Sequence, residues 1–195
     1  MFKKILLAAV VAVSASFAQI NVGVRGAVDM NTLWGDNADD AASGIGFQAG
    51  AGVKISLPLL PITVAPEVVI DMRNYDLSEE VTSTEWALDI PILIRFSLMP
   101  ILYLEAGPMF AFNLSVSAED DDGNEVKFDE DYFNTFEFDL VFGVGTGIVP
   151  FVDIDFRVNL GMTKTEAEHD VLGIATVKAR EAYNLQFVLG ATYWF

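Results

Sequence analysis

The chain has 195 residues, a hydrophobic fraction of 52% and a formal net charge of −17 at pH 7. A chain that is both this apolar and this acidic is expected to sort its side chains into one apolar surface and one strongly polar surface. The absence of cysteine excludes a disulfide framework and thiolate chemistry. The acidic excess argues against a nucleic-acid partner, because phosphate binding needs clustered Lys and Arg.

The first 18 residues are predicted to be a cleaved signal peptide. Lys3 and Lys4 form a basic start, and an unbroken apolar run covers Ile5–Val13. Ser16–Ala18 then places small residues at the two positions that a signal peptidase reads, which favours cleavage before Gln19. The apolar run is too short to cross a bilayer as a helix.

Residues 19–195 are predicted to form one domain of eight β-strands. Apolar and polar residues alternate along this region with a period of two, which is typical of strands that have one apolar and one polar face. The alternating segments are 20–31, 45–57, 62–73, 85–98, 102–116, 136–148, 152–162 and 183–195. Each is long enough to cross a bilayer at the usual tilt, which takes about 9–11 residues.

The connections between these segments alternate in length. Four are long (35–43, 74–83, 117–135 and 164–182), and three are short (58–61, 99–101 and 150–151). An antiparallel up-and-down barrel places all the long connections at one end, as outer-membrane barrels do with their outer loops. Prolines in the short connections fit strand ends. A further hairpin that extends the last two strands is expected within 171–179.

Alternation alone leaves two barrels open. A soluble lipocalin-like barrel has its apolar face inside, and a membrane barrel has it outside. The apolar face carries too many large aromatic side chains for the interior of an eight-stranded barrel, which is just wide enough for side chains to fill. Glycines recur on the polar face instead, where they leave room in a crowded lumen. The apolar face is therefore expected to meet lipid.

The charges on the polar face support the same orientation. A Lys or Arg that faced lipid would cost about 2–4 kcal/mol at mid-membrane, whereas opposite charges inside a lumen can pair. The polar face carries ten acids and five bases. The acids are Asp29, Glu67, Asp71, Glu85, Asp89, Glu105, Glu137, Asp139, Asp153 and Asp155, and the bases are Arg25, Lys54, Arg73, Arg95 and Arg157.

Aromatic residues gather near the ends of the segments, which resembles the two interfacial girdles of membrane barrels. The predicted girdle residues are Trp34, Trp86, Phe136 and Tyr183 at the loop end, and Phe96, Phe151, Tyr193 and Phe195 at the turn end.

The C-terminal segment carries a family resemblance. Phe187, Leu189, Ala191, Tyr193 and Phe195 alternate up to a terminal aromatic residue. This resembles the final-strand signal by which the barrel assembly machinery recognises outer-membrane proteins. With the signal peptide and eight strands, residues 19–195 resemble the small bacterial outer-membrane β-barrel superfamily, which includes the OmpA-like membrane domain and PorT-like barrels.

The resemblance implies an all-β, eight-stranded antiparallel transmembrane barrel in the bacterial outer membrane, reached by export through the periplasm. It implies outer-membrane lipid as surroundings, and the barrel assembly machinery as a partner during biogenesis through the strand that ends in Phe195. It implies no single activity, because a fold does not fix a function.

Two features of the sequence are candidate sites of chemistry. His169 is the only histidine and precedes Asp170, but a rim enzyme acting on lipid or peptide needs further partners, and no serine lies in that loop. The long connection 117–135 is rich in carboxylates, which suit weak Ca²⁺ or Mg²⁺ binding, although a solvated anionic loop is favoured. The acids of this loop are Glu119, Asp120, Asp121, Asp122, Glu125, Asp129, Glu130 and Asp131.

The sequence therefore predicts a structural or surface-interacting outer-membrane barrel with acidic outer loops and a charge-paired lumen. No catalytic, cofactor-binding or metal-ligating residue is assigned, and no cofactor is expected. A rim-site enzyme and a narrow pore remain as alternatives.

Overall fold

The computed structural model describes residues 19–34, 43–57, 60–78, 81–120, 125–128, 135–164, 170–171, 175–176 and 183–195. The predicted signal peptide lies outside these ranges, so its cleavage stays a prediction. In the described part of the chain, no helix has both the length and the apolar character to cross a bilayer.

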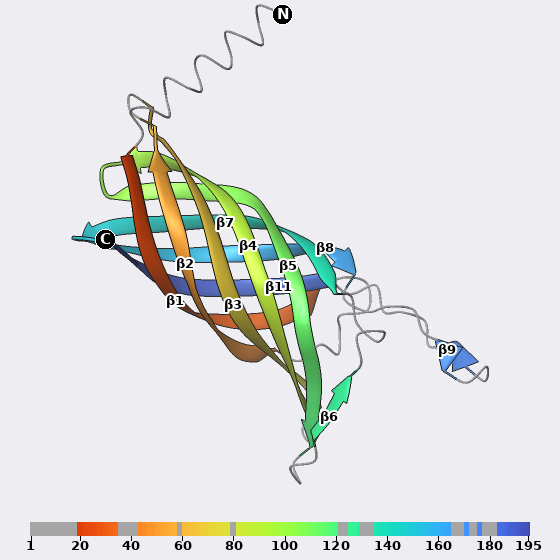
Figure 1. Cartoon of the computed structure of the whole chain (residues 1–195). Helices are drawn as coiled ribbons and strands as arrows, with labels where there is room; N and C mark the ends of the chain where they lie inside the picture. The colour runs from red at the N-terminus through yellow and green to blue at the C-terminus, as the bar shows by residue number, and fades with distance from the viewer. Residues whose placement is uncertain are drawn as a thin grey trace, which may run out of the picture.

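Eight long antiparallel strands close into a barrel (Figure 1). They are β1 (Gln19–Trp34), β2 (Gly44–Ser56), β3 (Ile62–Ser78), β4 (Val81–Met99), β5 (Leu102–Asp120), β7 (Phe136–Val149), β8 (Val152–Lys164) and β11 (Tyr183–Trp194). Each strand pairs with its neighbour in the chain, and β1 pairs with β11 from Gly23↔Trp194 to Trp34↔Tyr183. The predicted up-and-down barrel of eight strands is confirmed.

Short turns join the strands at one end of the barrel. Met99 is in register with Leu102, and Val149 with Val152. The second of these turns contains Phe151, whose φ of 64° lies in the left-handed region. The three short connections therefore lie at one end, which we call the turn end, and the opposite end is the loop end.

The predicted loop 74–83 is wrong, because most of it is strand. β3 runs to Ser78 and β4 begins at Val81, with Asn74 in register with Thr84. The hydroxyl of Thr84 donates to Oδ1 of Asn74 at 2.9 Å. Polar residues carry no hydrophobic alternation, yet Thr and Ser favour strands and hydrogen-bond across them. The strands therefore continue where the hydrophobic pattern stops.

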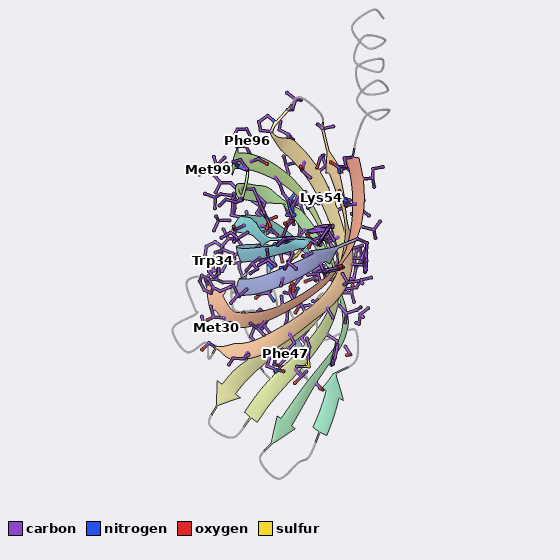
Figure 2. The ribbon with its side chains drawn as sticks, turned by 90° about the vertical axis from the view of Figure 1, so that its left-hand side faces the viewer. Met30, Trp34, Phe47, Lys54, Phe96 and Met99 are labelled. Carbon is purple, nitrogen blue, oxygen red and sulfur yellow. The ribbon has the colours of Figure 1, made fainter. Side chains whose placement is uncertain are left out.

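The predicted loop 117–135 is also partly strand. β5 runs to Asp120 and pairs with a short strand β6 (Glu125–Phe128), so that Glu119 lies in register with Glu125. The paired ends of β3 and β4, and of β5 and β6, project past the other strands at the loop end (Figures 1 and 2). These two extensions form a raised rim on one side of the barrel.

The hairpin expected within 171–179 forms, but not as an extension of the barrel strands. β9 (Asp170–Val171) pairs with β10 (Ala175–Thr176) in a separate two-stranded sheet.

The outer wall of the barrel is apolar, as predicted. Met30, Trp34, Phe47, Phe96 and Met99 project from it (Figure 2). Phe47, for example, keeps 55% of its surface exposed. Such a wall is stable only against lipid, because it is far larger than the apolar patches that soluble monomers expose.

Aromatic side chains pair on this wall at both ends of the barrel. The ring centroids of Trp34 and Tyr183 lie 5.3 Å apart at the loop end, and those of Tyr193 and Phe195 lie 5.2 Å apart at the turn end. These positions fit interfacial girdles.

One position departs from the predicted alternation. The sequence predicts Ser115 on the inner face, but a β-bulge at Leu114 of β5, between the pairs Ala87↔Asn113 and Trp86↔Ser115, turns Ser115 outward, and it is exposed. A bulge inserts one extra residue and so reverses the faces that follow it.

Candidate functional site

The inner face of the barrel is charged and buried. Each of the ten predicted lumen acids has an exposed fraction of 9% or less. The four arginines are buried to the same extent, and Lys54 is half-buried. Glycine makes room for these side chains, since a Cβ at Gly190 would meet the guanidinium of Arg25.

Four bases and four acids near the turn end form one connected group, the turn-side network. Its members are Arg25, Lys54, Arg95, Arg157, Glu67, Glu105, Asp153 and Asp155. Its formal charges balance, so each buried charge has a counter-charge within reach. Pairing of this kind offsets the large cost of removing ions from water.

Glu67 is the central acceptor of the turn-side network. Its two carboxylate oxygens accept from Nη1 and Nη2 of Arg157, both at 2.8 Å, and from Nη2 of Arg95 at 3.3 Å. Arg25 donates through both Nη atoms to Asp155, at 2.6 and 2.8 Å. Such two-pronged contacts use the planar fork of arginine, which lysine lacks.

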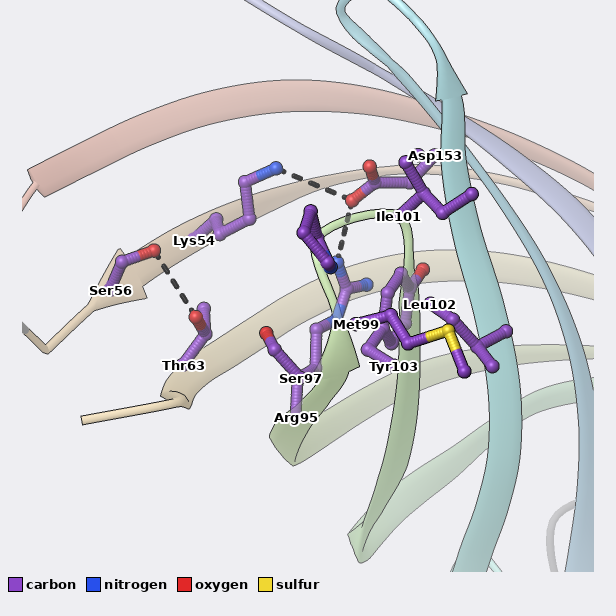
Figure 3. Close-up of a pocket in the computed structure, with 12 residues that line it drawn as sticks. Lys54, Ser56, Thr63, Arg95, Ser97, Met99, Ile101, Leu102, Tyr103 and Asp153 are labelled. Atoms are coloured by element: carbon purple, nitrogen blue, oxygen red, sulfur yellow. Dashed lines mark hydrogen bonds and ion pairs between the residues drawn. The ribbon is translucent and has the colours of Figure 1, made fainter.

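A cavity of about 180 Å³ opens at the turn end above this network (Figure 3). Polar side chains line it, including Lys54, Ser56, Thr63 and Ser97. The guanidinium of Arg95 lies at the inner side of the cavity, 4.8 Å from the ring centroid of Tyr103 and 5.6 Å from that of Trp194.

Asp153 ties the walls of this cavity together. Its Oδ2 accepts from Lys54 at 3.3 Å, from Arg95 at 3.0 Å and from the indole of Trp194 at 2.8 Å. The last strand is thereby joined to β2 and β4 across the lumen. This cross-link forms part of the wall of the cavity.

A second group, the loop-side network, surrounds Arg73. The Arg73 guanidinium pairs with Asp71 at 2.8 Å, Asp89 at 3.0 Å, and Glu85 and Glu137 at 3.3 Å. Asp29 and Asp139 are buried close to the same guanidinium. One base therefore faces six acids, which is a formal excess of five negative charges.

Amide side chains link strands within the loop-side half. Nε2 of Gln186 donates to Oδ1 of Asn31 and to Oδ2 of Asp71, both at 2.9 Å. Its Oε1 accepts from Asn159 at 2.5 Å. Amides suit this role because each is both a donor and an acceptor.

Buried apolar side chains from five of the eight strands, which we call the apolar layer, lie between the two networks. It consists of Val69, Leu93, Met109, Val141 and Val188, each 3% exposed or less. Val69 lies between Glu67 and Asp71 on β3, and Leu93 lies between Asp89 and Arg95 on β4. Leu93, Met109 and Val141 pack together with Ala65.

Sequence reasoning missed the apolar layer. Five of the eight strands contribute one residue each to it, and β1, β2 and β8 contribute none, so no single segment shows it. The available signal was an apolar residue that recurs among the charged inner positions of five segments, such as Val69 between Glu67 and Asp71.

The sites weighed for chemistry fall mostly outside the described residues. His169 is among these, and so are Asp121, Asp122 and residues 129–131 of the acidic loop. Of the remaining acids there, Glu119, Asp120 and Glu125 lie on β5 and β6. Across the ranges that the structure describes, no three His, Asp or Glu side chains are grouped so as to hold a metal ion.

An apolar wall, two aromatic belts and a charged, packed lumen define an integral outer-membrane β-barrel of eight strands. The sequence matches the family model described as outer membrane protein beta-barrel domain over residues 15–166, and the chain belongs to this family. Its location is the bacterial outer membrane.

Solved structures share this fold at low identity. Neisserial surface protein A (NspA) is 12% identical with a TM-score of 0.56, over 89% of this chain and 97% of that one. The attachment invasion locus protein Ail of Yersinia pestis, in complex with the heparin analogue sucrose octasulfate, is 12% identical with a TM-score of 0.50, over 91% of this chain and 99% of that one. The search of curated proteins gave no match.

Proposed function

We propose that the protein is a non-conducting barrel with a structural or surface-interaction role, closed by the apolar layer and the charge-paired turn-side half of its lumen, and interacting through the loop end. The observation that carries the proposal is the apolar layer. Leu93 is fully buried, and Met109 and Val141 keep 3% and 2% of their surface. A hydrated ion that crossed this layer would lose its water without gaining a polar partner.

The loop end is the surface offered for interaction. The extensions of β3 to β6 project past the other strands there, toward the bottom of the view in Figure 2. Residues 117–135 carry eight acids and one base, Lys127. The partner is therefore expected to be cationic, because opposite charges attract and steer encounter. The sulfated ligand in the Ail structure is anionic, and an acidic loop would repel such a ligand.

During biogenesis, the partner is the barrel assembly machinery. The proposal is supported by the last strand, β11, which ends in alternating aromatic residues. The backbone N–H of Phe195 donates to the carbonyl of Val22 at 2.9 Å, so the terminal residue adjoins the strand that closes the barrel.

Planar-bilayer recording tests the closed lumen. We expect no stepwise conductance from the wild-type protein, and we expect Leu93→Gly to show open events because it removes the largest side chain of the layer. The outer-wall variant Ile94→Gly is the matched control. Stable conductance from the wild type would overturn the proposal and establish the narrow pore instead.

Two further assays test the orientation of the loop end and the alternative of a rim-site enzyme. Protease added to intact cells should cut within 117–135 and leave the short turns whole, and the reverse pattern would contradict the orientation. His169→Ala should change neither the lipid-A profile nor peptide cleavage. A change in either would establish the rim-site enzyme.

A further inference from the structure

The cavity at the turn end presents more positive than negative charge. Of the described residues that line it, Lys54 and Arg95 are basic and Asp153 is acidic (Figure 3). The other three acids of the turn-side network do not line it. A small ion inside the cavity therefore meets two bases and one acid at close range, although the network as a whole is balanced.

Lys54 is the base that a ligand can recruit. Its Nζ lies 3.3 Å from Oδ2 of Asp153, the longest of the three hydrogen bonds that this oxygen accepts. Asp153 keeps the donors of Arg95 and Trp194 when the ammonium group turns toward a ligand. Lys54 is suited to this because its ammonium stands on a flexible four-carbon stem and binds phosphate as a point charge. Its side chain also keeps 23% of its surface exposed.

Hydroxyl groups add uncharged donors to the same cavity. The hydroxyls of Ser56 and Thr63 lie 3.1 Å apart, and one of them donates to the other. Since each hydroxyl carries one hydrogen, the second hydrogen remains available to a ligand. Ser97 lines the cavity as well, and it is exposed. The donors thus converge from β2, β3 and β4, which suits a tetrahedral anion with acceptor oxygens in several directions.

Tyr103 contributes a buried donor that lacks an acceptor. Only 8% of its surface is exposed, and its hydroxyl has no hydrogen-bond partner among the described residues. A Cβ at Gly145 would meet this hydroxyl, so it lies over β7 close to Gly147, which lines the cavity together with Tyr103. A buried hydroxyl without an acceptor is costly. An oxygen of a bound anion would supply the missing acceptor.

We infer that the turn-end cavity binds a small phosphate-type oxyanion between Lys54, Tyr103 and the hydroxyls of Ser56, Thr63 and Ser97. The volume of about 180 Å³ has room for such an ion together with water. Free phosphate and the phosphate of a lipid headgroup at the turn-end rim offer the same chemistry. The inference goes beyond the proposed function, which places the interaction surface at the opposite end of the barrel.

The test uses the refolded full-length mature chain in an uncharged detergent. Sodium phosphate is titrated at pH 7 and constant ionic strength, with NaCl as balance, and unfolding in urea is followed by tryptophan fluorescence. The unfolding equilibrium constant should fall about 10-fold when phosphate reaches about 10 times its dissociation constant. Titration calorimetry should report one bound phosphate per chain.

A second arm distinguishes the two sources of phosphate. Lysophosphatidylglycerol is mixed into the micelles without free phosphate, and the matching monoacylglycerol serves as its control. Stabilisation by free phosphate assigns the site to a soluble anion, and stabilisation by the phospholipid alone assigns it to a headgroup. A wild type that responds to neither overturns the inference.

Two variants locate the site. Tyr103→Phe keeps the ring and removes only the hydroxyl, so it should be at least as stable as the wild type without phosphate and should bind phosphate about 10-fold more weakly. Lys54→Gln should lose most of the phosphate effect. Lys164→Gln, at the loop end of β8, changes the net charge equally and should respond like the wild type.

The inference is overturned if Tyr103→Phe and Lys54→Gln both bind phosphate as the wild type does. It is also overturned if Lys164→Gln weakens binding as much as Lys54→Gln, since the effect would then be one of net charge alone. Bilayer conductance is independent of these outcomes and tests the proposed function separately.

Discussion

The balanced turn-side network predicts a large loss of stability on removal of a single charge. We expect Glu67→Gln to lower the free energy of unfolding by about 3–5 kcal/mol, the usual loss when a buried ion pair is broken from one side. Glu67 accepts from Arg157 at 2.8 Å twice and from Arg95 at 3.3 Å.

The geometry explains the size of this loss. Glutamine keeps the volume of glutamate but replaces one acceptor oxygen by an NH₂ group, which points its hydrogens at an Arg157 donor. One charge-assisted hydrogen bond is then lost, at about 1.5–3 kcal/mol. The network also changes from neutral to a formal charge of +1, and the unpaired guanidinium accounts for the remainder.

The matched control is the same substitution in the loop-side network. Glu85 is also buried, and it pairs with Arg73 at 3.3 Å. Since Arg73 keeps Asp71, Asp89 and Glu137, Glu85→Gln leaves no base without a counter-charge and should lower the free energy of unfolding by about 1.5 kcal/mol or less, the net contribution of one hydrogen bond. Urea unfolding in detergent and heat-modifiable gel migration measure both. Equal losses in the two variants would refute the reasoning from charge balance.

Three further predictions concern packing, orientation and assembly. Gly190→Ala should lower the free energy of unfolding by about 1–3 kcal/mol, because the new Cβ meets the guanidinium of Arg25. The control Gly26→Ala has open space around its Cβ and should leave the free energy of unfolding in urea unchanged. Leu189→Arg on the lipid face should lower the free energy of unfolding by about 2–4 kcal/mol. If Leu189→Arg proved as stable as the apolar control Leu189→Phe, the predicted orientation of the wall would be wrong. Deletion of Phe195 should lower the amount of barrel assembled in cells but leave refolding in detergent unchanged, and normal assembly would speak against the terminal signal.

The sequence predicted the wall of the barrel well. Lipid, unlike a protein core, places the same demand on every outward position, so alternation is regular within the eight segments and the faces can be assigned. The lengths of the strands were less predictable. Beyond Arg73, the backbone of β3 stays paired with that of β4 over polar residues such as Asn74 and Thr84, which alternation does not detect.

The partners inside the lumen could not be predicted. Each pair depends on which inner residues share the same depth, and this depth follows from the register and tilt of all eight strands. Glu67, for example, meets an arginine 90 positions later in the chain. The bulge that turns Ser115 outward shows the same limit, since one inserted residue reverses the assignment that follows it.

The distance along the chain between these partners has a consequence for folding. Arg25 and Asp155 are 130 positions apart, and Gln186 and Asn31 are 155 apart. Such contacts form late, because the entropy of closing a long loop must be offset first. Until β1 meets β11, the buried arginines and carboxylates would face each other across an open seam. Completion of the last hydrogen-bonded seam and neutralisation of the turn-side network are therefore one event, and a barrel that closed in the wrong register would leave ions of this network unmatched.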